Sequence, residues 1–226
     1  MVGEQGAAAD GVGADSDAVS DTDGLPSGLD GPADLEGLDP LLIEGMRVLR
    51  YPHTTEKDEN GEQTEWHCDV VVADGVPAPG FSTYATSGVR QFPTNLTSED
   101  GKELCTEFVL AARTTAREAA DVADACALAA SNGTFHIAPG AVIPDAVKFV
   151  APNLRCEHIL LVPPFLWPEL EVVRDLSDDV VLTRLQAVPI TRGELQFAAE
   201  KGADALMERL ESRGADVSNF DRPSVV

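Results

Sequence analysis

Alternating apolar and polar positions at 46–51 and, more weakly, at 102–112, together with short apolar stretches between turn signals, predict a series of β-strands between residues 46 and 188. Side chains along a strand point to opposite faces in turn, so a period of two residues marks a strand with one face buried. The polar stretch 52–65 contains the turn signal Asn60-Gly61, which predicts that the first two strands form a β-hairpin. The predicted strands cover residues 46–51, 66–72, 81–86, 102–112, 154–162 and 180–188, the last of them stopped by Pro189.

Helical periodicity predicts two main helices. The first covers residues 116–131, with Thr115 and Glu118 as a capping box at its start and a left-handed cap at its end. The second begins at a capping box of Thr191 and Glu194 and runs on to Gly214 as one helix. Its apolar stripe includes Gly202, and a glycine within a helix lowers the helix stability by about 1 kcal/mol relative to alanine. We expect close packing of this glycine on the sheet to offset that cost. The stripe is Leu195, Ala198, Ala199, Gly202, Leu206 and Leu210.

These elements predict an α+β fold: a mixed β-sheet of about six to seven strands with two main helices packed on it. Residues 1–38 differ from the rest, because they contain no aromatic residue and are rich in Gly, Asp and Ala. Such a segment buries too little apolar surface to offset the entropy lost on ordering. We therefore expect a disordered acidic tail at 1–38 and one folded domain at 39–226.

The net charge of −23 excludes two classes of partner. Nucleic acids and anionic membrane surfaces are both bound through basic faces, and this chain has 16 Lys and Arg against 39 Asp and Glu. Only four of the basic residues are lysines. A composition rich in acids and poor in lysine suits a cytosol of very high salt, where a short Debye length screens self-repulsion.

The four cysteines and the N-terminus predict a cytoplasmic protein. Cys68, Cys105, Cys126 and Cys156 form no C-x-x-C pair and are expected to be small buried apolar residues rather than disulfide partners. The first residues carry neither a basic segment nor an apolar one, so we expect no export signal. No stretch approaches the ~20 apolar residues that a membrane-spanning helix needs.

The chain contains none of the short motifs that mark common catalytic sites. Cys156 and His158 are two residues apart on a predicted strand, so they share one face with Leu154 and Leu160. That spacing is compatible with a metal site, but packing in the core explains it better. Glu103 and Glu107 are compatible with an acid–base pair beside a groove, although a solvated face is the better interpretation in so acidic a chain.

A proline-bounded loop at 163–170 carries bulky apolar residues where no regular element can bury them. Phe165 and Trp167 on a rigid loop are typical of the anchors that dominate the free energy of protein–protein binding. The alternative is that they fold back over the edge of the sheet as a small satellite core.

Several segments, taken in order, resemble the Suppressor of fused domain family over roughly residues 46–226. Residues 84–88 with their Thr86-Ser87-Gly88 turn, and the acidic–apolar strand that follows, are similar to the family's pattern. The resemblance continues through the second half of the chain to its end. The segments are 84–88 (YATSG), 103–108 (ELCTEF), 157–167 (EHILLVPPFLW), 185–191 (LQAVPIT) with Glu194, 202–206 (GADAL) and 220–225 (FDRPSV).

The resemblance implies a domain that binds proteins and has no catalytic residues. The animal member of the family holds a transcription factor by accepting an extended peptide, and bacterial members are similar to immunity proteins that neutralise a toxin by binding it. We therefore expect a non-enzymatic protein-binding module without metal or cofactor, with a basic toxin domain as its candidate partner. The candidate contact residues are Tyr84, Phe165, Trp167 and Glu169.

Two other functions stay open at this point. The first is a regulator of the same family that sequesters a cellular protein. The second is a metal-dependent hydrolase that uses Cys156 and His158.

Overall fold

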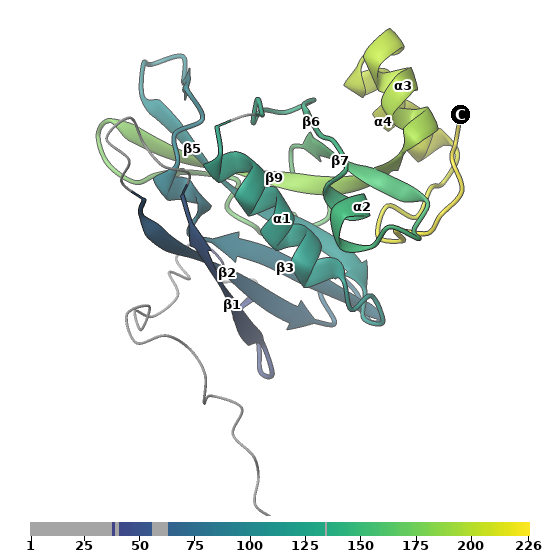
Figure 1. Ribbon diagram of the computed structural model, residues 1–226, viewed down its shortest axis with the longest axis horizontal. Helices are drawn as coiled ribbons and strands as arrows, with labels where there is room; N and C mark the ends of the chain where they lie inside the picture. The colour runs from purple at the N-terminus through teal and green to yellow at the C-terminus, as the bar shows by residue number, and fades with distance from the viewer. Residues whose placement is uncertain (1–37, 39–40, 56–62, 134) are drawn as a thin grey trace, which may run out of the picture. The chain divides into compact units, whose positions relative to one another are not determined.

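A mixed β-sheet forms the centre of the fold (Figure 1). The structure is a computed structural model, and it describes residues 38, 41–55, 63–133 and 135–226. Nine strands lie within the described part of the chain. They are β1 (Arg47–Thr54), β2 (Glu65–Asp74), β3 (Phe81–Ser87), β4 (Leu96–Thr97), β5 (Glu103–Arg113), β6 (Val142–Ile143), β7 (Cys156–Val162), β8 (Val173–Asp175) and β9 (Val180–Thr191).

The main path of the sheet has the order β1-β2-β3-β5-β9-β7-β6. Only β5 and β9 pair in parallel; the other pairs are antiparallel. The predicted hairpin of the first two strands is confirmed as the β1–β2 pair, whereas the turn at Asn60-Gly61 lies outside the described residues. The predicted mixed sheet is confirmed with more strands than expected. The extra strands β4, β6 and β8 have two or three residues each, too few to show a period of two.

Helices cover both faces of the sheet. The described helices are α1 (Ala119–Ser131), α2 (Ala146–Val150), α3 (Arg192–Lys201) and α4 (Ala203–Ser212), with a short 3-10 helix, η2 (Val89–Gln91). Neighbouring residues on one strand show the two faces: Leu161 packs with α1 and α2, and Leu160 packs with α3 and α4. Figure 1 shows α1 and α2 together on one side of the sheet.

Three apolar clusters make up the core of the part of the chain that the structure describes. The largest joins one face of the sheet to the alanine-rich face of α1. The other face carries two separate clusters, one under α3 and α4 and one that includes Val71, Val109 and Trp167. The second of these also buries Leu38 and Leu41. The predicted tail at 1–38 otherwise lies outside the described residues.

Both main helices differ from the sequence prediction, the first at its start and the second along its length. Helix α1 starts at Ala119 without a side-chain cap, so the predicted capping box at Thr115 and Glu118 is wrong. Residues 114–118 instead form turns, one of them closed by the Ala116 N–H donating to the Arg113 carbonyl at 2.8 Å. The glycine cap at Gly133 is confirmed, because its φ of +62° is left-handed.

The long C-terminal helix predicted from 191 to 214 is two helices. Gly202 adopts φ +94° and ψ 159°, which breaks the helix between α3 and α4. A Cβ at this position would meet nothing within 4 Å, so the expected close packing on the sheet is also wrong. Gly202 is there because this backbone conformation is almost exclusive to glycine.

Strand β9 runs through Pro189 to Thr191, three residues beyond its predicted end. Proline removes a backbone donor, so it is tolerated where one side of a strand has no ladder to complete. The parallel partner β5 pairs with β9 only as far as Gln186, which leaves that side of Pro189 open. The antiparallel partner β7 still pairs with β9 at this point.

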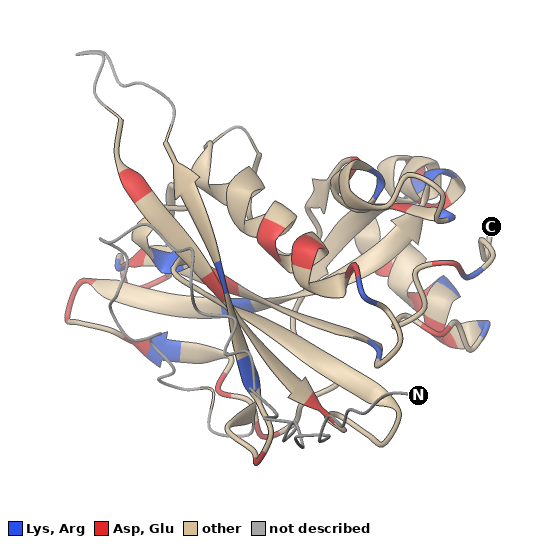
Figure 2. Ribbon diagram, turned by 60° about the horizontal axis from the view of Figure 1, so that its bottom comes forward, with Lys and Arg blue, Asp and Glu red and all other residues tan. Residues whose placement is uncertain are grey.

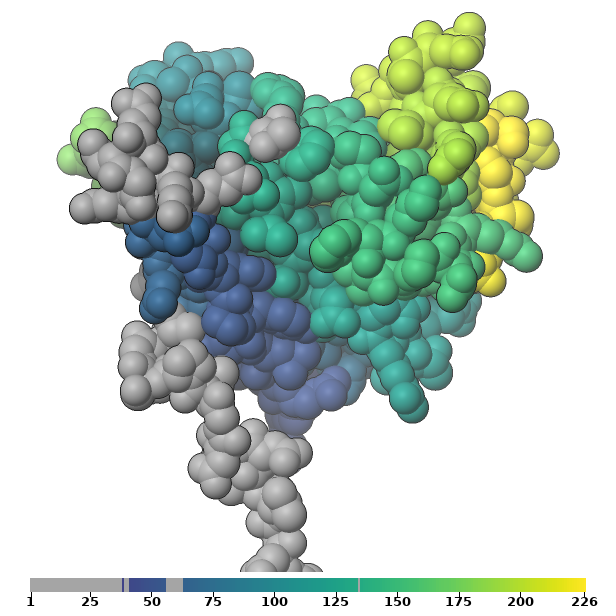
Figure 3. Space-filling view, viewed as in Figure 1, coloured from purple at the N-terminus to yellow at the C-terminus, as the bar shows by residue number. Residues whose placement is uncertain are grey.

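The C-terminal segment closes over α3. The capping box of Thr191 and Glu194 is confirmed, and the Glu194 carboxylate also binds the Arg222 guanidinium and the Val225 N–H. Both charged side chains are buried, at 0% and 3% exposure. Figure 3 shows the C-terminal segment in yellow against the yellow-green helices α3 and α4.

Candidate protein-binding cleft

Two hydrogen bonds fix the loop 163–170 on the sheet. The Phe165 N–H donates to Gln186 Oε1 on β9 at 3.1 Å. The Trp167 Nε1–H donates to Thr83 Oγ1 on β3 at 2.8 Å. Both acceptors are fully buried side chains on strands, so a rigid surface positions the loop.

The loop divides its apolar residues between core and surface. Trp167 and Leu170 fold back over the sheet, at 4% exposure each, as the satellite-core alternative predicted. Phe165 stays 49% exposed, and Glu169 is also at the surface. Tyr84 is 6% exposed, and its hydroxyl donates to the Ala116 carbonyl on the far side of the sheet from the loop. The structure therefore places Phe165 and Glu169 at the surface. Tyr84 and Trp167 lie in the core, because their rings pack within its apolar clusters.

An apolar cleft of about 700 Å³ opens between the loop 163–170 and α4, and we call it the loop–helix cleft. Its lining includes residues of both apolar clusters on this face of the sheet, with Leu166 packed against one and Leu210 in the other. Its volume lies within the roughly 300–1,000 Å³ of typical binding sites. The apolar lining is Phe165, Leu166, Met207, Leu210, Ala215 and Val217.

Three carboxylates line the rim of the loop–helix cleft: Asp204, Glu208 and Glu211. Their spacing of four and three residues places them on one face of α4. All three are exposed, and none forms an ion pair within the described residues. The lining residues that the structure describes include no Lys or Arg. Figure 2 shows acidic and basic positions on several strands and helices of the fold.

The predicted carboxylate pair on β5 is not a solvated face. Glu103 is exposed, but Glu107 is 4% exposed and accepts three hydrogen bonds from the end of β3 and the turn that follows it. The donors are the Thr86 hydroxyl at 2.6 Å, the Gly88 N–H at 2.9 Å and the Arg90 N–H at 3.0 Å. Burial raises the pKa of Glu107, and these hydrogen bonds oppose that rise. Glu107 thus fixes a turn instead of facing a groove.

The sequence predicted that Cys156 and His158 share one face of β7, and this prediction is wrong. The strand is irregular between them, so Cys156 pairs with Thr191 while His158 pairs with Ile190. Thr191 and Ile190 are successive residues of β9 and point to opposite faces. The bulge therefore separates the two proposed metal ligands, which removes the basis of the hydrolase hypothesis.

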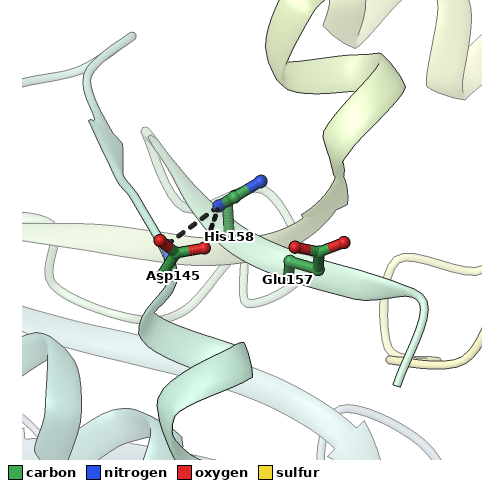
Figure 4. A group of neighbouring side chains, drawn as sticks. All are labelled: Asp145, Glu157 and His158. Atoms are coloured by element: carbon green, nitrogen blue, oxygen red, sulfur yellow. Dashed lines mark hydrogen bonds and ion pairs between the residues drawn. The ribbon is translucent and has the colours of Figure 1, made fainter. Parts of the chain in front are cut away.

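His158 instead lies near Asp145 and Glu157, the one group of three potential metal ligands among the described residues (Figure 4). His158 Nδ1 and the Glu157 carboxylate already have partners. His158 Nδ1 accepts the Asp145 N–H at 2.9 Å, and Glu157 is paired with Lys148 at 3.1 Å and Arg192 at 3.0 Å. Burial lowers the pKa of His158. These contacts explain the group as part of the fold.

The cysteines are buried and free, as the sequence predicted. Burial raises the pKa of Cys126 and of Cys156 to about 12. A thiol becomes a nucleophile only as the thiolate, so these groups are poorly suited to covalent chemistry. Within the described ranges, no helix is long and apolar enough to cross a membrane.

Taken together, the described residues form an α+β domain whose candidate site is an apolar cleft with an acidic rim. The family model of the Suppressor of fused protein (SUFU) matches residues 64–223. The chain therefore belongs to the Suppressor of fused family, which confirms the resemblance seen in the sequence.

Three known proteins are similar to this chain. Immunity protein YqcF of Bacillus subtilis (strain 168) is 34% identical over 159 residues, which cover 70% of this chain and 81% of that protein. A crystal structure of a SUFU homolog from Neisseria gonorrhoeae FA 1090 matches with a TM-score of 0.57 at 18% identity, covering 85% of this chain and 94% of that one. A structure of the Sufu-Fu complex matches with a TM-score of 0.51 at 14% identity, covering 70% of this chain and 77% of that one. The two solved structures confirm the fold.

Proposed function

We propose that this protein is a non-enzymatic binding module that acts as an immunity protein: it neutralises a cognate toxin by binding it. The observation that carries the proposal is the 34% identity to Immunity protein YqcF over most of both chains. The loop–helix cleft supports it, because an apolar cleft beside an exposed phenylalanine on a fixed loop is suited to contact with a protein.

The four predicted contact residues take different parts in this proposal. Phe165 and Glu169 are exposed and contact the toxin directly. Trp167 holds the loop in place through its bond to Thr83, and Tyr84 supports the core beneath the sheet. The toxin has a basic surface, since the net charge of −23 attracts such a surface and speeds association at low salt.

The test uses a candidate toxin domain encoded beside this protein in its genome. The toxin is expressed in a host with and without the full chain, and the two purified proteins are mixed and passed over a sizing column. We expect restored growth and a stoichiometric complex. Continued growth arrest in the presence of soluble, folded protein would overturn the proposal for that toxin.

The Sufu-Fu complex supports a second function, a regulator that sequesters a cellular protein, because a member of the same fold is found there with a protein partner. The two functions differ in what the protein captures. Capture of a housekeeping protein together with failure to protect against every neighbouring toxin would favour the regulator.

We also propose that the protein acts in the cytoplasm, and in one of high salt. The support is the composition, with 39 acids and only four lysines. Added salt screens the repulsion between like charges, so it stabilises a chain of this composition. The midpoint of thermal unfolding should rise between 0.1 M and 2 M NaCl, and an unchanged or lower midpoint would contradict this assignment.

A further inference from the structure

We propose that the loop–helix cleft binds a segment of the partner that carries a bulky apolar side chain flanked by lysine or arginine. This inference rests on the proposed function and specifies the chemistry of the bound segment. It follows from the lining of the cleft, the charge of its rim and the contacts that hold its two walls.

The walls of the cleft are held by different parts of the fold. One wall is the loop 163–170, fixed by the bonds from Phe165 and Trp167 to the sheet. The other wall is α4, whose buried Leu206 and Leu210 pack on β7 and β9. Because both walls rest on the same sheet, little ordering is needed when a partner binds, and pre-organisation of this kind favours affinity.

The floor of the cleft requires an apolar group from the partner. Apolar side chains on both sides offer little hydrogen bonding to a ligand: Leu166 on one side, and Met207, Leu210, Ala215 and Val217 on the other. Phe165, which is 49% exposed at the edge, provides an aromatic ring for further contact. A large aliphatic or aromatic side chain that enters this space removes apolar surface from water on both partners.

The rim requires positive charge around that apolar group. Asp204, Glu208 and Glu211 repel one another along one face of α4, at spacings where like charges destabilise a helix by a few tenths of a kcal/mol per pair. Lysine or arginine on either side of the anchor relieves this repulsion and pairs with the carboxylates. An acidic segment meets the opposite effect, so the N-terminal 46 residues of this chain, which contain eleven acids and no base, do not suit the cleft.

The first experiment selects 12-residue peptides from a random display library on the purified full-length protein. The selected peptides are then titrated against two variants: Phe165→Ser, which alters the cleft, and the double variant Glu208→Lys/Glu211→Lys, which reverses the charge of its rim. The matched control is Phe149→Ser, because Phe149 is an even more exposed phenylalanine, at 82%, on α2 across the sheet. All these side chains are exposed, so the substitutions leave the core intact.

We expect the selected peptides to share a bulky apolar residue flanked by Lys or Arg. Their dissociation constants should rise by about tenfold or more on either cleft variant and stay within about twofold of wild type on Phe149→Ser. The effect of the charge reversal should diminish in 1 M salt, whereas that of Phe165→Ser should persist. Peptides that are acidic, or that bind wild type and the cleft variants equally, would overturn the inference.

The same variants then enter the toxin-protection assay, which separates this inference from the proposed function. Protection by wild type and by Phe149→Ser, but not by the two cleft variants, supports both. Protection by every variant leaves the immunity function standing and overturns the cleft as its site. No protection by wild type, with cleft-dependent peptide binding retained, overturns the immunity function alone.

Discussion

The Thr86 hydroxyl on β3 donates a hydrogen bond of 2.6 Å to the Glu107 carboxylate on the neighbouring strand β5. The same carboxylate accepts the N–H groups of Gly88 and Arg90 through its other oxygen. One buried side chain therefore satisfies one donor at the end of β3 and two donors of the turn that leaves the sheet after it. The two sequence segments that resemble the family in this region, Thr86-Ser87-Gly88 and the strand 103–108, are thus bonded to each other.

Glu107→Ala is predicted to destabilise the fold by about 3 kcal/mol or more, because it leaves buried donors without an acceptor. Glu107→Gln is predicted to cost less: its amide oxygen still accepts from Gly88 and Arg90, and its NH₂ group can donate to the Thr86 hydroxyl. Urea unfolding of the two variants measures the difference. Equal losses would contradict the assigned hydrogen-bond pattern.

A comparison of the stabilities of Gly88→Ala and Gly202→Ala distinguishes the cost of a steric clash from the cost of backbone strain. Both glycines have positive φ, at +121° and +94°. A Cβ at residue 88 would lie 2.5 Å from the His67 carbonyl oxygen, whereas one at residue 202 would meet nothing within 4 Å. Gly202→Ala should therefore cost only the strain of about 1–3 kcal/mol, and Gly88→Ala should cost more than that. Equal thermal stabilities of the two variants would show that the turn at 88 can shift.

Arg222→Ala is predicted to destabilise the protein by about 3–5 kcal/mol, because it leaves the Glu194 carboxylate buried without its cation. Arg155→Ala is the matched control, since the ion pair of Arg155 with Asp221 is exposed and should contribute less than about 1 kcal/mol. Chemical unfolding measures both. A loss below about 1 kcal/mol for Arg222→Ala would mean that the C-terminal segment is not held by this pair.

The same pair predicts a dependence of stability on pH. Burial alone would raise the pKa of Glu194, but the Arg222 guanidinium and the N–H groups of Thr191 and Val225 outweigh it and lower that pKa below the usual 4.5. A lowered carboxyl pKa stabilises the fold at pH values above 4.5, and this stabilisation is lost as the pH falls through the pKa of the folded state. The difference in unfolding free energy between wild type and Glu194→Gln should therefore shrink from pH 6 to pH 3. A constant difference would contradict the lowered pKa.

Trp167→Phe tests whether Trp167 positions the loop or contacts the partner. The substitution keeps an aromatic ring in the core and removes the hydrogen bond to Thr83, at a cost of about 1 kcal/mol in unfolding free energy. Partner affinity should fall less than it does for Phe165→Ser, whose side chain is exposed. A greater loss of affinity in Trp167→Phe, with the fold intact, would assign the partner contact to Trp167.

Local sequence patterns were sufficient to predict a structural feature wherever a single segment of the chain determines that feature. The apolar stretches of β2, β7 and β9, the capping box of Thr191 and Glu194, and the glycine cap after α1 all depend on residues close together in the chain. The short strands β4 and β8 leave no such signal, because they exist only through pairing with β5 and β9. The bulge in β7 likewise depends on its register with β9, so the sequence placed Cys156 and His158 on one face.

The sequence by itself determined the family, the α+β class and the acidic charge, since these follow from composition, periodicity and the order of short motifs. Only the tertiary structure decided that Trp167 lies in the core while Phe165 stays exposed, because that division depends on Thr83 and Gln186, which come from distant strands. It also decided that Gly202 separates two helices and that the loop 163–170 faces α4 across a cleft. A cleft exists only between segments that folding brings together, so no local pattern along the chain contains it.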